Sequence, residues 1–226
     1  MGLYGTGMLM TFTEVAPEDE DEYNEWYNRE HIDERVWMPG FHRARRYVAV
    51  DSDARVKYFA SYETGTVRDL ADPDYMARLQ VQSEWSQKVM AGFTKFDRLT
   101  AEITIDQTHG FSGWLGVTRF FPEESQRDGL RNLLKEEVFP DLKGRLNMLG
   151  GCLAENDIEV SNIGLSAQGK PVPPGQIPEW IVLLDGATEA AVRDANDGLA
   201  DALEGAGLAS ASLDRTIYGF LFGNNR

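Results

Sequence analysis

Alternating hydrophobic and polar positions predict strands, and apolar positions three or four residues apart predict helices, in a definite order along the first half of the chain. The first predicted helix begins after Pro17, whose fixed φ suits a first helical turn, and Pro39-Gly40 ends it. The predicted elements are strands over 7–15, 41–50, 56–63 and 96–105 and helices over 18–37 and 73–90. This order of strand, helix, strand, strand, helix, strand is that of the ferredoxin-like unit.

The second half repeats this order, which indicates an internal duplication. Phe96-Asp97-Arg98-Leu99-Thr100 near the end of the first half resembles Leu213-Asp214-Arg215-Thr216-Ile217 near the end of the second. The predicted elements are strands over 113–121, 149–160, 179–185 and 212–222 and helices over 123–143 and 188–204. The second half is the longer one, and the proline- and glycine-rich stretch 161–178 is the expected insertion, because these residues interrupt a strand ladder.

The open faces of the two sheets predict how the halves assemble. Helices cover one face of a ferredoxin-like sheet, and the other face is apolar and needs a partner. Two halves in one chain can bury these faces against each other without a second chain. The sequence therefore predicts an α+β protein in which two tandem ferredoxin-like βαββαβ halves close a pseudo-dimeric α+β barrel. We expect a first half over 1–106 that carries the site, a connector over 107–112, and a mainly structural second half over 113–226.

Composition narrows the range of partners. The chain has 226 residues, of which 42% are hydrophobic, enough for a buried core. Its formal net charge of −15 argues against non-specific binding to nucleic acid or to an anionic membrane, because both need positive potential. The single cysteine excludes an internal disulfide, and no apolar run approaches the ~20 residues of a membrane span. We expect a cytoplasmic protein with a small-molecule substrate and no nucleic-acid or membrane partner. The sequence leaves open whether two copies form a homodimer.

The first predicted helix carries the candidate chemistry. Its aromatic and ionisable residues fall on one stripe at helical spacing, namely Tyr23, Trp26, Tyr27, Glu30, His31 and Glu34. A purely structural face would have Leu, Ile or Val there. His31 titrates near neutral pH and could exchange a proton with a weakly acidic carbon or hydroxyl, with Glu30 or Glu34 fixing its tautomer. The alternative is that His31 packs the helix on the sheet and bonds a backbone carbonyl.

Three segments of the first half resemble a known superfamily. They are Trp26-Tyr27-Asn28-Arg29-Glu30-His31, Met38-Pro39-Gly40-Phe41-His42-Arg43 and Tyr58-Phe59-Ala60-Ser61-Tyr62-Glu63. Their pattern resembles the dimeric α+β-barrel superfamily, especially its EthD-like branch, in which a Trp-Tyr-x-x-x-His helix leads into a Pro-Gly-Phe turn and an arginine-rich strand. The resemblance covers 7–105, and the second half follows only the order of strands and helices. It implies that His31 faces a cavity between sheet and helices.

The residue types suggest roles within such a site. We expect His31 to act as general acid or base, with Tyr27 and Tyr62 as hydrogen-bond partners of a developing oxyanion. The residues expected to bind substrate are Tyr23, Trp26, Glu30, Arg43, Arg45, Tyr58, Trp85 and Phe93. Arg43 or Arg45 would hold an acidic group, unless the protein's own carboxylates pair with them. Trp85 and Phe93 would roof an aromatic-lined pocket, unless they are plain core.

These residues predict a cofactor-independent enzyme of the lyase, isomerase or cyclase type that acts on a small hydrophobic or aromatic substrate, as in aromatic compound catabolism. Each of these reactions begins with proton abstraction next to an electron sink. A non-catalytic binder of an aromatic metabolite is the alternative. A cofactor-free monooxygenase and a haem protein, both known in the superfamily that the chain resembles, are less favoured. No metal site is expected from three scattered histidines and one cysteine.

Overall fold

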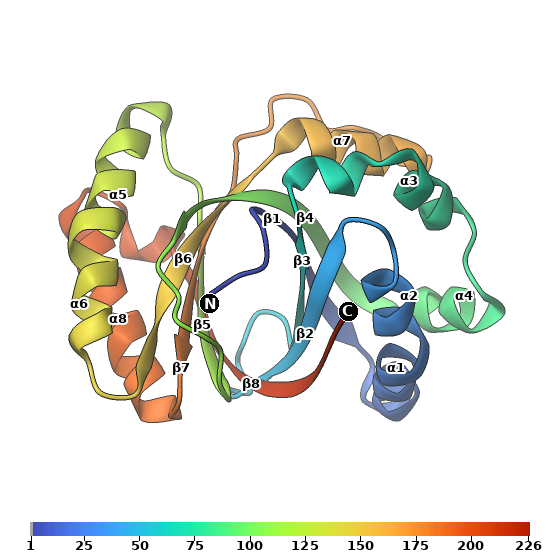
Figure 1. The fold of residues 1–226 in the computed structure, drawn as a ribbon, viewed down its shortest axis with the longest axis horizontal. Helices are drawn as coiled ribbons and strands as arrows, with labels where there is room; N and C mark the ends of the chain where they lie inside the picture. Colours follow the sequence, from blue (N-terminus) through green and yellow to red (C-terminus); the bar gives the residue numbers. More distant parts are fainter. Residues whose placement is uncertain (1) are drawn as a thin grey trace.

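In residues 2–226, which the computed structural model describes, antiparallel strands form a closed barrel with helices on its outside (Figure 1). The strands are β1 (Gly7–Val15), β2 (Phe41–Ala49), β3 (Tyr58–Thr64), β4 (Phe93–Asp106), β5 (Trp114–Phe120), β6 (Met148–Asn156), β7 (Trp180–Gly186) and β8 (Asp214–Asn225). They close in the order β1-β3-β2-β8-β5-β7-β6-β4. Each half therefore has the same internal order, β4-β1-β3-β2 and β8-β5-β7-β6, and the pairs β2–β8 and β4–β6 join the halves. The predicted fold class is confirmed.

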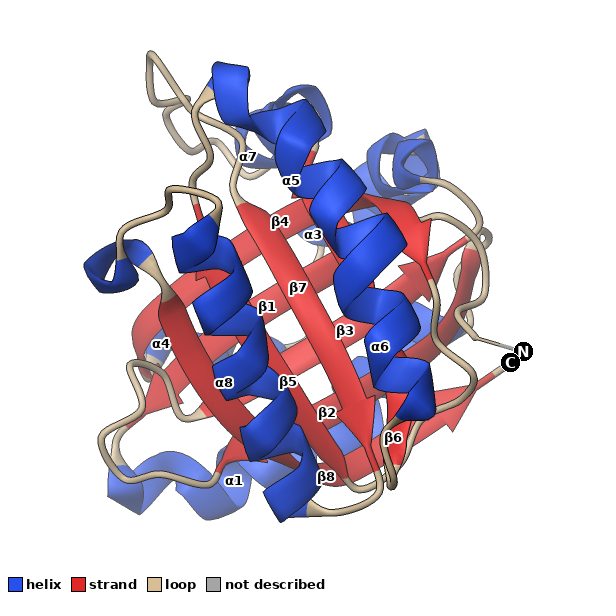
Figure 2. Ribbon diagram, turned by 90° about the vertical axis from the view of Figure 1, so that its left-hand side faces the viewer, coloured by secondary structure: helices blue, strands red, loops and turns tan. Residues whose placement is uncertain are grey.

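The helices lie in two groups, one against each half of the barrel. The α-helices are α1 (Glu20–Trp26), α2 (Ile32–Val36), α3 (Pro73–Gln80), α4 (Glu84–Ala91), α5 (Arg127–Leu133), α6 (Phe139–Gly144), α7 (Ile158–Ala167) and α8 (Glu189–Gly205). Two π-helical segments, Tyr27–His31 and Leu134–Val138, connect α1 to α2 and α5 to α6. Short 3-10 helices cover Pro17–Asp19, Val67–Ala71, Glu124–Gln126 and Ser210–Ser212. Figure 2 shows α5, α6 and α8 lying across the strands of the second half.

Three hydrophobic cores follow from the alternation of side chains along the strands. On β1, Met8, Met10 and Phe12 belong to the core inside the barrel. Leu9 belongs to the core between the first-half sheet and its helices. A third core fills the corresponding layer of the second half. The open faces of the two sheets are thus buried against each other, as the sequence predicted.

Two predicted elements differ from the structure. The helix predicted over 73–90 is two helices, because Val81 adopts an extended conformation and the Ser83 side chain caps a new helix by accepting from the Ser86 N–H at 2.9 Å. The strand predicted over 149–160 ends at Asn156. Asp157 then accepts from the Val160 N–H at 2.9 Å and caps α7, so a helix occupies the start of the expected insertion.

Helix α7 belongs to the second half in sequence but packs on the first half. It contacts α3, β4 and the 3-10 helix Val67–Ala71. Figure 1 shows it beside α3 at the top of the barrel. The second half therefore supplies part of the helical layer over the first half. None of the helices in residues 2–226 is both long and apolar enough to cross a membrane.

Candidate active site

A cavity of about 600 Å³ lies between the sheet of the first half and the helices that cover it. Its size is that of a small-molecule pocket. The residues that line it are Leu9, Thr11, His31, Arg35, Tyr62, Tyr75, Leu79, Gln80, Gln82, Met90, Phe93, Phe96, Arg98, Ala167, Gln168 and Lys170. Strands β1, β3 and β4 provide the sheet side of the cavity. The π-helical segment Tyr27–His31, α2, α3, the residues after α3, and α4 provide the helical side, and the end of α7 with the residues that follow it closes the top.

A π-helical turn positions His31. The N–H of Ile32 donates to the Tyr27 carbonyl, five residues earlier, rather than to the carbonyl four residues earlier. This wider turn brings Trp26 and His31 together, with ring centroids 4.3 Å apart, and the rings of Tyr27 and His31 meet in a T-shaped arrangement with centroids 5.0 Å apart. The indole and phenol rings therefore hold the imidazole at the cavity wall.

The second half contains the same turn without the histidine. Its π-helical segment ends at Val138, which packs on the second-half core. The π turn is therefore a feature of both halves of the fold. The imidazole at its end is what distinguishes the first half.

The surroundings of His31 favour the neutral imidazole. Burial, together with the guanidinium groups of Arg35, Arg46 and Arg78, holds the pKa of His31 well below its ordinary value. Its Nδ1 atom is buried without a hydrogen-bond partner among the described residues. In the tautomer that carries the proton on Nε2, the Nδ1 atom is a free hydrogen-bond acceptor.

Three further residues of the cavity wall have a buried polar atom without a hydrogen-bond partner, although Arg35 Nη1 lies 4.0 Å from Glu34 Oε2. These atoms are Nη1 of Arg35, the hydroxyl of Tyr62 and Oε1 of Gln82, among the described residues. Burial raises the pKa of Tyr62 well above its ordinary value, and neighbouring Tyr27 adds to the shift, so this hydroxyl keeps its proton. Buried polar groups are normally paired. Four such groups around one cavity are the arrangement expected where a ligand supplies the missing partners.

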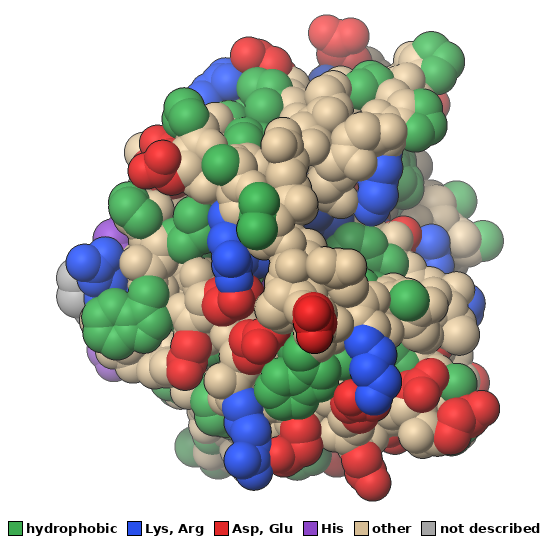
Figure 3. Space-filling view, turned by 90° about the vertical axis from the view of Figure 1, so that its right-hand side faces the viewer, with side chains coloured by type: hydrophobic (Ala, Val, Ile, Leu, Met, Phe, Trp, Pro, Cys, Tyr) green, Lys and Arg blue, Asp and Glu red, His purple; other side chains and the backbone are tan. Residues whose placement is uncertain are grey.

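The rest of the wall is largely apolar and aromatic, and its charges have one sign. Leu9, Tyr75, Leu79, Phe93 and Phe96 provide broad hydrophobic surface. The charged side chains of the wall are all basic, Arg35, Arg98 and Lys170, although acidic side chains are numerous on the helical face of the first half (Figure 3). The cavity thus suits an aromatic ligand that carries or develops negative charge.

The predicted site residues of the first helix lie in two layers. His31 lines the cavity together with Tyr62 and Phe93. Beneath them Tyr23, Trp26, Tyr27 and Tyr58 are buried in the core between helix and sheet. Tyr27 is one contact away from the cavity, because its hydroxyl lies 3.3 Å from Oγ1 of the lining residue Thr11. Trp85 packs on the same core without lining the cavity.

The carboxylates expected to fix the histidine tautomer have other partners. Glu30 accepts from Ser86 Oγ at 3.1 Å and also from Ser83 Oγ. Ser86 in turn accepts from the indole N–H of Trp26 at 3.0 Å. Glu34 pairs with Arg78 through one carboxylate oxygen, and its other oxygen lies 4.0 Å from Arg35 Nη1. Glu30 therefore fixes Trp26, on which His31 stacks, and does not bond the imidazole itself.

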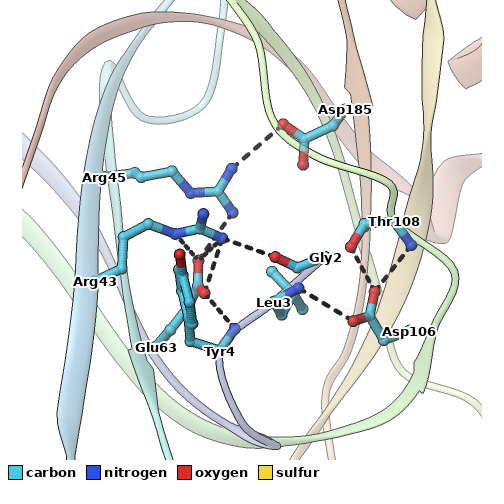
Figure 4. A network of polar contacts seen from close by, with 9 residues as sticks. All are labelled: Gly2, Leu3, Tyr4, Arg43, Arg45, Glu63, Asp106, Thr108 and Asp185. Carbon is cyan, nitrogen blue, oxygen red and sulfur yellow. Dashed lines mark hydrogen bonds and ion pairs between the residues drawn. The ribbon is translucent and has the colours of Figure 1, made fainter. Parts of the chain in front are cut away.

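Arg43 and Arg45 face the inside of the barrel, where the protein's own carboxylates pair with them (Figure 4). Arg43 donates from Nε and Nη2 to Glu63 at 2.8 and 2.9 Å. Arg45 lies 3.3 Å from both Glu63 and Asp185. Neither arginine lines the cavity that contains His31. The next residue, Arg46, faces the helices and bonds Asn28 Oδ1 at 2.7 Å.

Several cavity residues were not predicted from the sequence. Arg35 had a usable signal, because it follows His31 by four positions on the same helical face. Gln82 lies in the break between α3 and α4, and Gln168 and Lys170 follow α7, so their approach depends on elements that the sequence did not reveal. In residues 2–226 no group of three or more His, Cys, Asp or Glu side chains is placed to hold a metal ion.

Known proteins share this fold at low sequence identity. No family model matches the chain, and no curated protein sequence matches it. An anthrone oxidase-like protein superposes with a TM-score of 0.64 at 11% identity, over 98% of this chain and 93% of its own. A candidate monooxygenase from Lactobacillus acidophilus superposes with a TM-score of 0.59 at 11% identity, over 97% of this chain and 96% of its own. A mutant chlorite dismutase from Candidatus Nitrospira defluvii, in complex with cyanide, superposes with a TM-score of 0.56 at 9% identity, over 97% of this chain and 92% of its own. These similarities establish the dimeric α+β-barrel fold.

Proposed function

We propose that this protein is a cofactor-independent enzyme in which His31 removes a proton from a small aromatic substrate. The observation that carries the proposal is that polar atoms of His31, Arg35 and Tyr62 lie on the wall of one aromatic-lined cavity without a hydrogen-bond partner. A base and two hydrogen-bond donors around a hydrophobic site are the groups that proton abstraction next to a carbonyl requires.

The chemistry follows from the charges of these groups. Neutral His31 accepts the proton from a carbon or hydroxyl whose conjugate base is delocalised onto an oxygen. Arg35 and the protonated Tyr62 hydroxyl donate hydrogen bonds to that oxygen and stabilise its negative charge. The negative charge of the substrate anion in turn offsets the positive charge of the new imidazolium of His31. Return of the proton to another atom gives isomerisation, whereas loss of a leaving group from the anion gives a lyase reaction.

Cofactor-free oxygenation is a second candidate function. It is favoured by the structural neighbours described as an anthrone oxidase-like protein and as candidate monooxygenases. It begins with the same proton abstraction, after which the substrate anion reacts with molecular oxygen. In the oxidation of anthrone, one oxygen atom enters the new carbonyl group and the other leaves as water.

The surroundings of His31 do not fit an axial ligand of haem iron. A metal-binding histidine usually has its second ring nitrogen hydrogen-bonded to a carboxylate, a carbonyl or water. Among the described residues no hydrogen bond to His31 is present, and both nearby carboxylates, Glu30 and Glu34, are held by other groups.

Anthrone is a suitable first probe, because it is an aromatic ketone with an acidic methylene group. We expect the wild-type protein to accelerate deuterium incorporation at this methylene in D₂O under nitrogen, as measured by NMR. His31→Gln should lower the catalysed exchange by ~100-fold or more, the usual contribution of a general base. His42→Gln is the matched control, because His42 is exposed and does not line the cavity.

The outcomes separate the candidate functions. Exchange that is equally fast in His31→Gln contradicts the proposed base. Anthrone binding without accelerated exchange favours the non-catalytic binder. Oxygen consumption with formation of anthraquinone in air, above the rate in buffer, favours the oxygenase over the isomerase or lyase.

A further inference from the structure

A second cavity of about 550 Å³ adjoins the one that contains His31. The two cavities share four lining residues, Phe96 and Arg98 of β4 and Gln168 and Lys170 after α7. Arg98 and Lys170 are thus the charged groups at the junction. The combined space is larger than a single ring system needs, so a ligand can extend from His31 to this junction.

Arg98 is held in the wall by an aromatic residue instead of a carboxylate. Its Nη2 donates to the Tyr75 hydroxyl at 3.2 Å, and its guanidinium lies 5.9 Å from the centre of the Tyr75 ring. No Asp or Glu among the described residues lies within ion-pair distance of Arg98 or Lys170. This is unusual in a chain with 37 acidic against 22 basic residues.

The equivalent position in the second half shows what an ordinary structural arginine does in this fold. Arg98 of β4 pairs with Thr11 of β1, and Arg215 of β8 pairs with Thr118 of β5, so the two arginines occupy the same place in their sheets. Arg215 forms an ion pair with Asp197 of α8. The helix over Arg98 is α7, and it offers Gly164 rather than a carboxylate.

Gly164 leaves the space that the Arg98 guanidinium occupies. A Cβ atom at this position would lie 2.7 Å from Nη1 of Arg98, closer than any side chain tolerates. The carboxylates of the second cavity are also unavailable to Arg98, because Arg119 bonds both Glu179, at 2.7 Å, and Asp97, at 3.2 Å. The positive charge at the junction is therefore uncompensated by the protein.

We propose that Arg98 and Lys170 form a carboxylate-binding subsite, and that the substrate is an aromatic carboxylic acid whose ring lies toward His31. The planar guanidinium donates to the carboxylate oxygens, and the Lys170 ammonium adds a second positive charge. This inference deepens the proposed function and rests on it for the place of the reacting atoms. It gives the helix inserted in the second half a role in substrate recognition.

A pair of matched probes tests the subsite. 2-Naphthoate and 2-naphthamide have the same rings and nearly the same shape, but only the first carries a charge. We expect isothermal titration calorimetry to show that the wild-type protein binds 2-naphthoate about tenfold or more tightly than 2-naphthamide. Added salt should weaken the binding of 2-naphthoate and leave that of 2-naphthamide nearly unchanged.

Variants assign the preference to the two cations. Arg98→Gln and Lys170→Gln should each reduce the preference for 2-naphthoate, and the double variant should abolish it. Arg215→Gln is the matched control, because it removes the equivalent arginine of the second half, and it should keep the wild-type preference. Lys170 is exposed, so its substitution leaves the fold intact even if Arg98→Gln lowers the melting temperature.

The outcomes are distinct from those for the proposed function. Equal affinity of the wild-type protein for the two probes, absence of 2-naphthoate binding, or equal effects of Arg98→Gln and Arg215→Gln would overturn the subsite. His31→Gln should keep the preference for 2-naphthoate. If Arg98 governs that preference but His31 does not affect proton exchange, the subsite stands as a binding site and the catalytic proposal fails.

Discussion

At the scale of single residues, the proposed chemistry depends on a base and two donors that the protein leaves without hydrogen-bond partners. A buried polar atom without a hydrogen bond costs about 1–3 kcal/mol. His31, Arg35, Tyr62 and Gln82 carry such atoms around one cavity. Arg35 has two effects, because its charge lowers the pKa of His31 in the free protein and would stabilise an anion beside it. An anionic ligand should therefore raise the pKa of His31.

The lowered pKa of His31 predicts a pH-dependent stability. Between its ordinary value of 6.5 and its lower value in the folded protein, the unfolded chain binds a proton that the folded protein does not. The stabilising contribution of neutral His31 is therefore complete above about pH 6.5 and decreases as the pH falls. Urea denaturation at about pH 7.5 and about pH 5 should show a larger loss of unfolding free energy for the wild-type protein than for His31→Gln. Equal losses would contradict a histidine that the folded protein keeps neutral.

The unpartnered hydroxyl of Tyr62 predicts a separation of stability from activity. Tyr62→Phe removes no hydrogen bond, so the unfolding free energy should stay the same or rise by about 1 kcal/mol. Proton exchange on anthrone should fall about tenfold or more, because an oxyanion donor is lost.

Tyr218→Phe is the control for this change, because the Tyr218 hydroxyl is buried and donates to the Val56 carbonyl at 3.0 Å. Its loss should lower the unfolding free energy by about 1 kcal/mol and leave the exchange unchanged. A Tyr62→Phe variant that loses stability and keeps full exchange activity would show that the hydroxyl is structural.

At the scale of elements, two devices place the site. The π turn between α1 and α2 aligns residues five positions apart, so the rings of Trp26 and His31 are in contact although α-helical spacing would separate them. Helix α7 brings the end of an insertion from the second half over the cavity of the first. The π turn exists in both halves, whereas helix α7 makes the two halves different.

Close packing of α7 on Arg98 predicts the effect of a single methyl group. Gly164→Ala should leave the unfolding free energy unchanged or raise it by about 0.5–1 kcal/mol, because alanine favours a helix and the end of the arginine side chain can move. The displaced guanidinium should bind 2-naphthoate several-fold more weakly, by calorimetry, with the affinity for 2-naphthamide retained.

Gly198→Ala in α8 is the matched control. A Cβ at Gly198 would meet the nearest Arg145 nitrogen at 3.5 Å, an ordinary contact. It should affect neither affinity. If Gly164→Ala also keeps the affinity for 2-naphthoate, the position of the Arg98 guanidinium is not important for binding.

At the scale of the whole molecule, closing the barrel buries charges that link the two halves. Arg43, Arg45 and Glu63 of the first half and Asp185 of the second lie inside it (Figure 4). Burial raises the pKa of Asp185, while Arg45 opposes the shift. The cluster has equal numbers of positive and negative groups, so each depends on its partners.

Glu63→Gln should be strongly destabilising for this reason. The substitution leaves Arg43 without its carboxylate and Arg45 with Asp185 alone, which should lower the unfolding free energy by about 3–5 kcal/mol in urea denaturation. Glu189→Gln is the control, because its ion pair with Arg193 is partly exposed to solvent and should contribute about 1 kcal/mol or less. Equal effects of the two variants would show that the buried cluster does not stabilise the fold.

Local patterns sufficed to predict the order of the strands and the closure of the barrel. The alternation of Met8, Leu9, Met10 and Thr11 already separates an inner from an outer face of β1, and the same order of elements recurs in the second half. The break after Val81 and the start of α7 depend on the caps Ser83 and Asp157. These are short polar signals that compete with the longer hydrophobic pattern around them.

The sequence by itself determined the fold class and pointed to three residues that line the cavity, His31, Tyr62 and Phe93. These depend on periodicities and residue types within a few positions along the chain. Only the tertiary structure decided that Arg43 and Arg45 pair inside the barrel, whereas Arg35, Gln82 and Arg98 border the cavity. The partner of a charged side chain depends on which distant segment packs against it, and no local pattern specifies that.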